Sequence, residues 1–220
     1  MHWKELQKQI GKFPPAPHYF QALEQLSWDK AEELPHNIQI CCDFLDKSPE
    51  GEIDKQKLED VWLKIVEPLA DYVEGVFLER HGMLKAEDKK ELGVQCAGQA
   101  IQRMYDELTS LIGLTNASKL LHLRFPKLFV TTDELIRKYW IEEVGLNELF
   151  GIKEDELFNG YGYTFIFLPF IKDQAVDAIM TYANDKGISP NEAIAQLQNL
   201  GGKKRMIARL MDEYYYVITR

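Results

Sequence analysis

Two neighbouring stretches decide the fold of this chain: residues 111–119 read LIGLTNASK, and residues 129–137 read FVTTDELIR. Gly113 follows an apolar helical pattern and is the residue type that commonly comes just after the last turn of a helix. A second helix, an apolar link and a third helix with Asp133 at its start follow in order. This order can place the Asp133 carboxylate at the mouth of a cleft between helices.

Helical spacing of apolar residues continues on both sides of these stretches. Three prolines among residues 14–17 predict an extended arm, and residues 158–163 (FNGYGY) predict a loop because Asn-Gly permits positive φ. Residues 165–168 are open to two interpretations, a short strand or the start of a buried helix. The expected helices cover about 31–46, 54–80 with a stop at His81-Gly82, 85–111, 117–124, 131–143 with a Thr131 capping box, 173–186, a helix capped at Ser189, and a last helix reaching Tyr216.

These patterns predict an all-α, two-lobed helical globule with a helix-hairpin-helix-like segment. Residues 1–220 are expected to form a single compact helical unit, and residues 111–140 would lie between the lobes if there are two. Composition agrees with a folded chain, because 45% hydrophobic and 28% charged residues are ordinary globular values.

The charge balance limits the kinds of partner. The formal net charge of −9 disfavours sequence-blind attraction to polyphosphate or to anionic lipid. Residues 119–138 and 203–220 are nevertheless basic islands, with five basic and two acidic residues each. Contacts to a nucleic acid would therefore have to come from these basic segments and not from the protein surface as a whole.

The three cysteines, an odd number that includes the adjacent pair Cys41 and Cys42, predict a reducing compartment and a cytoplasmic protein. No apolar run approaches the ~20 residues that span a bilayer, so no membrane association is expected. The histidines have no metal-ligand spacing, and no phosphate-cradling loop is present. The sequence therefore predicts no metal and no cofactor.

Residues 111–137 resemble the helix-hairpin-helix signature of the DNA glycosylase superfamily, which includes the endonuclease III-like and alkylpurine enzymes. In that family a Leu-Pro-Gly-Val-Gly hairpin precedes a helix, and an aspartate and then an arginine follow an apolar link. Gly113 matches the hairpin, Phe129-Val130 the link, Asp133 the aspartate and Arg137 the arginine. Thr115 replaces the second hairpin glycine, and Ala117 stands where some members carry a Schiff-base lysine.

The resemblance implies a catalytic Asp133 that stabilises positive charge on deoxyribose while a base departs. It implies damaged or duplex DNA as the partner, with the nucleotide extruded into the cleft. The residues expected to bind the nucleic acid are Gly113, Lys119, Arg124, Lys127 and Arg137, with Tyr161 and Tyr163 stacking on the extruded base.

Structural alternatives exist for these residues. Asp133 is also an ordinary helix N-terminal carboxylate, and His122, among leucines, is expected to be part-buried and hydrogen-bonded. Adjacent carboxylates such as Asp212-Glu213 are expected on solvated helix faces. The alternative function is a non-catalytic helical interaction protein, with a protein partner, that retains only the scaffold.

Overall fold

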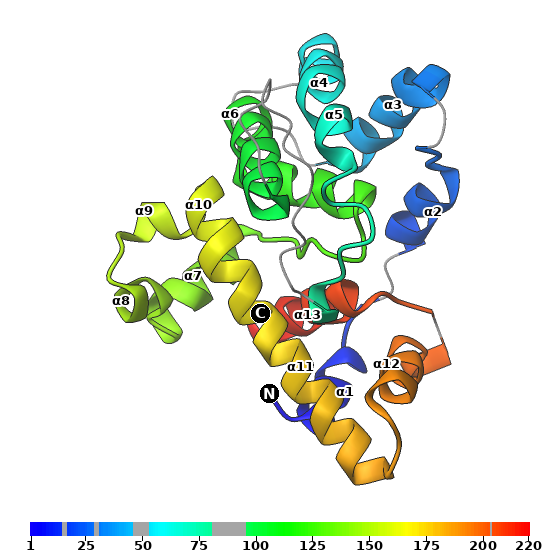
Figure 1. Cartoon of the computed structure of the whole chain (residues 1–220), viewed down its shortest axis with the longest axis vertical. Helices are drawn as coiled ribbons and strands as arrows, with labels where there is room; N and C mark the ends of the chain where they lie inside the picture. The colour runs from blue at the N-terminus through cyan, green and yellow to red at the C-terminus, as the bar shows by residue number, and fades with distance from the viewer. Residues whose placement is uncertain (15–16, 29–30, 46–52, 81–95, 203) are drawn as a thin grey trace.

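The computed structural model of the chain is built from helices (Figure 1), and it describes every residue except 15–16, 29–30, 46–52, 81–95 and 203. Over the described residues there is no strand, which confirms the predicted all-α class. The α-helices are α1 (Trp3–Ile10), α2 (Pro17–Gln25), α3 (Leu34–Phe44), α4 (Lys55–Val61), α5 (Glu67–Ala70), α6 (Ala97–Arg124), α7 (Glu134–Lys138), α8 (Leu146–Phe150), α9 (Glu154–Leu157), α10 (Gly160–Gly162), α11 (Leu168–Lys186), α12 (Pro190–Gln198) and α13 (Ile207–Ile218).

Shorter helical turns connect several of these elements. The π-helical turns Trp62–Val66, Tyr139–Glu143 and Tyr163–Phe167 join α4 to α5, extend α7 and join α10 to α11. The 3₁₀ turns are η1 (Ala31–Glu33), η3 (Leu78–Arg80) and η7 (Leu200–Gly202). Among the described helices, none is both long and apolar enough to cross a membrane.

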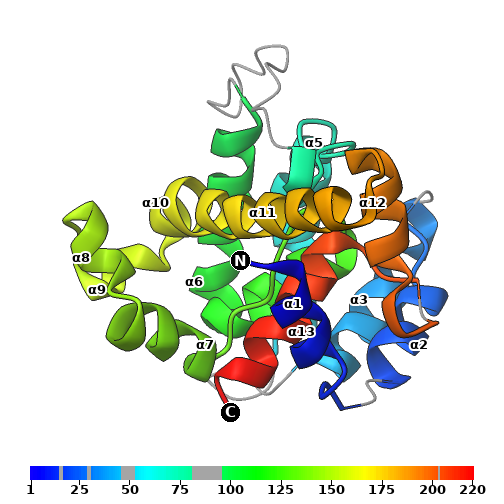
Figure 2. The same ribbon diagram turned by 90° about the horizontal axis from the view of Figure 1, so that it is seen from below.

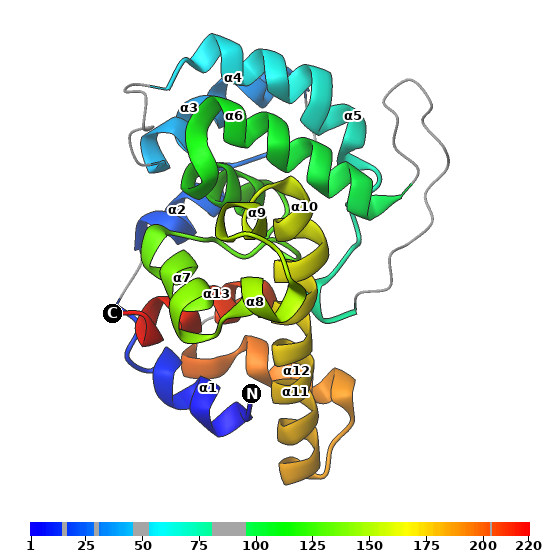
Figure 3. The same cartoon turned by 90° about the vertical axis from the view of Figure 1, so that its left-hand side faces the viewer.

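The helices gather in two groups, with α2 to α6 in one and α1, α11, α12 and α13 in the other (Figures 1 and 3). In Figure 2, α1 and α13 lie side by side next to α11. Trp3 ties α1 to the end of α11, because its indole Nε1 donates to Asp185 Oδ2 at 2.8 Å across 182 positions of sequence. One cluster of buried hydrophobic side chains includes members of both groups.

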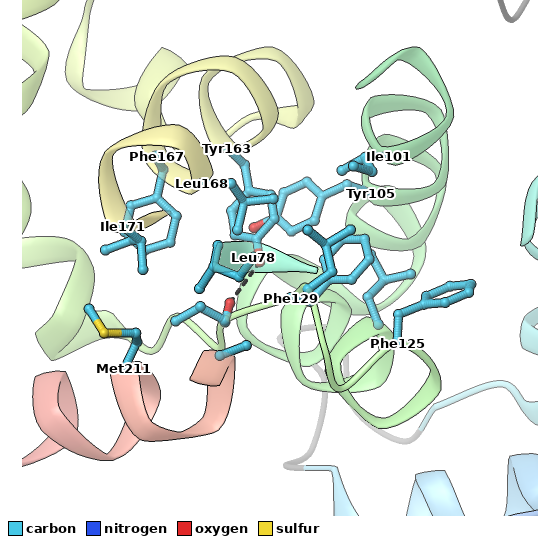
Figure 4. Packing of buried hydrophobic residues seen from close by; sticks show 14 of the residues in the cluster. Leu78, Ile101, Tyr105, Phe125, Phe129, Tyr163, Phe167, Leu168, Ile171 and Met211 are labelled. Atoms are coloured by element: carbon cyan, nitrogen blue, oxygen red, sulfur yellow. Dashed lines mark hydrogen bonds between the residues drawn. The ribbon is translucent and has the colours of Figure 1, made fainter. Parts of the chain in front are cut away.

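Aromatic rings fill the junction between the two groups (Figure 4). Tyr105 of α6 and Tyr163 stack with ring centroids 4.1 Å apart. The Tyr163 hydroxyl donates to the carbonyl oxygen of Val130 at 2.7 Å, which fixes the link between α6 and α7 against the π-helical turn that precedes α11. The link residues Phe129 and Val130 are thereby held in the buried core.

Several predicted boundaries agree with the structure. Ser189 caps α12 with a capping box that includes Glu192, and Gly187 ends α11 in the left-handed region. Gly113 has φ 78° and ψ 165° and interrupts α6, so the predicted break between two helices is confirmed at that residue. The helix ending near Glu143 is followed by Gly145 with φ 66°.

Other boundaries differ from the prediction. Asp133 caps α7, and Thr131 instead donates its hydroxyl to Asp212, because the extended backbone at Asp133 brings its own carboxylate to the first free amides. The helix expected over 54–80 ends at Ala70 and gives way to turns. Pro17 begins α2 rather than continuing an extended arm, because proline is well suited to a first helical turn. Residues 81–82 and 85–95 lie outside the described residues.

The loop predicted over residues 158–163 is replaced by a helix start. Asn159 caps it by accepting from Gly162 N at 2.9 Å, and neither Gly160 nor Gly162 has positive φ. Glycine is needed here for close approach: a Cβ on Gly160 would lie 2.2 Å from Asp106 Oδ1, and one on Gly162 would lie 2.1 Å from the Glu156 carbonyl oxygen. Residues 165–168 are accordingly helical, which excludes the strand interpretation.

Candidate functional site

A cavity of about 340 Å³ lies where the second half of α6, the link to α7, α13 and the α2–α3 pair meet. Its walls combine aromatic rings with charged side chains. The lining residues are Phe13, His18, Tyr19, Phe44, Lys119, His122, Thr131, Asp133, Ile136, Arg209, Asp212, Tyr216 and Arg220. Asp133 and Lys119 of the sequence-predicted set therefore face the same cavity.

Asp133 uses both carboxylate oxygens within the fold. Oδ1 accepts from the backbone N–H of Ile136 at 2.9 Å and caps α7. Oδ2 pairs with the guanidinium of Arg220 at the exposed rim. The structural role expected for Asp133 as a helix N-terminal residue is real, and it coexists with a position in the cavity wall.

Cationic groups and rings alternate along one wall of the cavity. The guanidinium carbon of Arg220 lies 3.5 Å from the Tyr216 ring centroid, and Tyr216 meets Phe13 edge-on at 5.1 Å. Arg209 then lies 5.1 Å from the Phe13 ring and 4.1 Å from the Tyr19 ring. Such a wall suits a planar ring, because aromatic and guanidinium faces both stack on one.

The floor of the cavity is formed by His122 and Tyr19, which are 1% and 4% exposed. His122 Nδ1 lies 2.5 Å from the Phe129 carbonyl oxygen, and Nε2 lies 2.7 Å from the Tyr19 hydroxyl. Burial lowers the pKa of His122 from 6.5 to about 4, against the opposing effect of Asp212, so the ring is neutral near pH 7. The predicted hydrogen bonding of His122 is confirmed, whereas its burial is complete and not partial as expected.

A buried ion network on α13 supports the floor. The Arg209 guanidinium pairs with Asp212 and, through Nε, with Glu213 Oε1 at 3.2 Å; Arg205 Nε also lies 3.0 Å from Glu213. Asp212 and Glu213 are 4% and 1% exposed, so their expected solvated position is wrong. Burial raises the pKa of Glu213, while Arg209 and then Arg205 oppose that rise.

The signal for this network was present in the sequence. Arg209 precedes Asp212 by three positions and Glu213 by four, which is the spacing of ion pairs along one helix face. The surrounding apolar residues of α13 allow the helix to be buried on most of its circumference. Charged residues in such a helix have to pair with one another.

Two arginines expected to bind the nucleic acid make contacts within the protein instead. Arg124 Nη2 lies 2.8 Å from Glu74, and its Nε lies 3.5 Å from Glu67. Arg137 Nη1 donates to Thr115 Oγ1 at 2.9 Å and to the Thr132 carbonyl at 3.1 Å. Arg137 thus holds α7 against the residues that follow Gly113, with Thr115 as its partner.

The remaining predicted residues are spread over the molecule. Lys127 lies 4.9 Å from the Phe77 ring, outside the cavity. Tyr161 is exposed and lies beside Phe165, with ring centroids 5.2 Å apart. Tyr163 is fully buried in the core, so its position does not suit stacking on an extruded base. Gly113 forms the kink in α6.

Comparison with family models, with curated proteins and with solved structures finds no match to this chain. Within the described part of the chain, no cluster of three or more His, Cys, Asp or Glu residues is arranged to hold a metal ion. The function therefore has to be argued from the cavity itself.

Proposed function

We propose that this protein binds nucleic acid and takes one nucleotide into the cavity, as DNA glycosylases of the helix-hairpin-helix type do, with Asp133 as the catalytic carboxylate. One observation carries the proposal: Asp133 lies in the wall of a cavity that is also lined by stacking rings and by Lys119. A nucleoside has a size suited to a cavity of about 340 Å³.

The chemistry follows from the charges in the cavity. Departure of a base leaves positive charge on the sugar, and a fixed carboxylate at its edge stabilises that charge. The hydrogen bond from Ile136 N holds Asp133 Oδ1 in place, while Arg220, at the partly exposed rim, occupies Oδ2. An incoming nucleotide would displace Arg220 toward its own phosphate and leave the carboxylate facing the sugar.

Asp133→Asn tests this role without removing the helix cap, because asparagine caps a helix about as well as aspartate. We expect base release from duplexes carrying damaged bases to fall by at least about 100-fold, the usual scale for one electrostatic group. The melting temperature should change by less than about 2 °C, because the partner of Asp133 is a partly exposed arginine. Gel-resolved strand cleavage at released bases and thermal unfolding measure the two effects.

Asp54→Asn is the matched control, since Asp54 caps α4 in the same way, by accepting from Lys57 N, and lies outside the cavity. It should retain full base release. Equal loss in both variants, or a large drop in stability with Asp133→Asn, would show that Asp133 acts only as a cap. Fluorescence anisotropy with an abasic-site duplex adds a binding measurement that does not depend on the choice of damaged base.

The second candidate is a non-catalytic helical interaction protein. The internal pairing of Arg124 with Glu74, and of Arg137 with Thr115, favours it because these groups are already satisfied. On this proposal neither an abasic nor an unmodified duplex binds above the level of an unrelated acidic protein. Both proposals take the protein to be cytoplasmic, which the three unpaired cysteines support.

A further inference from the structure

The hydrogen bonds at the floor of the cavity run in one direction. The Phe129 carbonyl can only accept, so the neighbouring His122 Nδ1 must carry the proton. A neutral imidazole has one N–H, which leaves Nε2 as an acceptor. The Tyr19 hydroxyl, 2.7 Å from Nε2, is therefore the donor in that bond.

This direction fixes what Tyr19 can offer to a ligand. Its single hydroxyl proton is committed to His122, so the oxygen can only accept a further hydrogen bond. The nearby Asp212 carboxylate accepts from the Thr131 hydroxyl and pairs with Arg209, and carboxylate oxygens are likewise acceptors. Because both Asp212 oxygens are already engaged, Oδ1 by Thr131 and Oδ2 by Arg209, the acceptor that the buried end of the cavity presents to a ligand is the Tyr19 oxygen.

We propose that Tyr19, held by His122, is the specificity-determining residue of the cavity and selects a nucleobase that carries an exocyclic amino group, such as adenine. When the cavity walls hold a base by the two faces of its ring, an exocyclic amino group projects from the ring edge and can reach the Tyr19 oxygen. A ring N–H projects less far from the edge and does not reach it. This inference deepens the proposed function and rests on it only in taking the cavity as the site of the base.

Matched nucleosides test the inference without any duplex. We expect 2′-deoxyadenosine to bind the wild type about fivefold more tightly than the same purine deoxynucleoside lacking the amino group, the scale of one neutral hydrogen bond. Tyr19→Phe should bind both nucleosides equally, because it removes the accepting oxygen. Isothermal titration calorimetry measures all four affinities.

Tyr182→Phe is the control, because it also removes a hydroxyl bonded to a side chain, Gln196 at 2.8 Å, and lies outside the cavity. It should keep the fivefold preference. A preference that survives in Tyr19→Phe, or the lack of one in the wild type, overturns the inference, and so does failure of both nucleosides to bind. A purely structural role for Tyr19 would lower both affinities together.

A second measurement needs no variant. The ¹⁵N spectrum of the His122 ring should show a protonated Nδ1 and an unprotonated Nε2, and the opposite tautomer overturns the direction of the hydrogen bonds. A preference for the amino-bearing nucleoside without any duplex binding would contradict the proposed function and support this inference. Base release without a preference between the two nucleosides would support the proposed function and contradict this inference.

Discussion

His122 is a histidine that the fold holds neutral by enclosing it. Its two ring nitrogens contact the Phe129 carbonyl and the Tyr19 hydroxyl, and the ring is 1% exposed. Burial deprives a protonated ring of hydration, and this effect, with repulsion from Arg209, outweighs the attraction of Asp212, so the folded state resists protonation of His122. The unfolded chain has no such resistance, and this difference links stability to pH.

We expect His122→Gln to remove a component of the pH dependence of folding. The wild-type pKa falls from 6.5 to about 4 on folding, so the unfolded state takes up the proton first. The contribution is fully present above the unfolded pKa of 6.5 and is lost as pH falls toward 4. It amounts to roughly 3 kcal/mol at about 1.4 kcal/mol per pH unit.

Urea unfolding of both proteins between about pH 7 and pH 4 measures this component, and the gap between wild type and His122→Gln should narrow as pH falls. His36→Gln, a change at an exposed histidine of α3, should leave the wild-type slope intact. Parallel curves for wild type and His122→Gln would rule out the assigned protonation state.

At the scale of single elements, the sequence predicts starts and stops where the chemistry is local. Ser189 with Glu192 and the left-handed Gly187 are such cases, because cap and partner lie within one turn. The Asn-Gly pattern predicts a loop at Gly160 and Gly162, whereas the need for glycine there comes from the close approach of the Asp106 carboxylate and of the Glu156 carbonyl. No short-range pattern contains that information.

Gly162→Ala should destabilise the fold by about 2 kcal/mol or more, because the new methyl group would meet backbone atoms of residues 156–157 that cannot swing aside. Gly11→Ala is its control: that glycine is right-handed, with φ −61°, and a Cβ there would lie 3.6 Å from its nearest neighbour. Its effect should stay within about 1 kcal/mol. Chemical denaturation of both variants checks the difference, and equal effects would refute the crowding at Gly162.

At the scale of the whole molecule, the candidate site is assembled from segments far apart in sequence. Asp133 and Lys119 belong to the stretch that the resemblance singled out, and both line the cavity; their functional roles stay predictions. Tyr19 and Asp212 were not among the predicted site residues, because they come from α2 and α13 and no local spacing connects them to Asp133. Chain folding alone brings these groups together.

The distribution of charge gives a whole-molecule prediction about salt. If duplex binding occurs, Lys119→Gln and Lys127→Gln should each reduce the slope of log K against log salt by about one, as expected for a lost phosphate contact. Arg124→Gln should leave that slope unchanged and lower thermal stability, because its guanidinium pairs with Glu74 and Glu67. Anisotropy titrations over a salt series measure the slopes. A reduced slope for Arg124→Gln would mean that Arg124 leaves Glu74 and Glu67 and contacts a DNA phosphate.

The pairing of α1 with α11 and α13 has a consequence for the order of folding. Closing contacts across most of the chain costs loop entropy that only a largely condensed protein can offset, so we expect α1 to dock on α11 and α13 late in folding. In the reverse direction, we expect α1 to be released early, together with Phe13, which follows α1 in the chain and lines the cavity. A ligand bound in the cavity would then lower the rate of unfolding, because it opposes the first movement that unfolding requires.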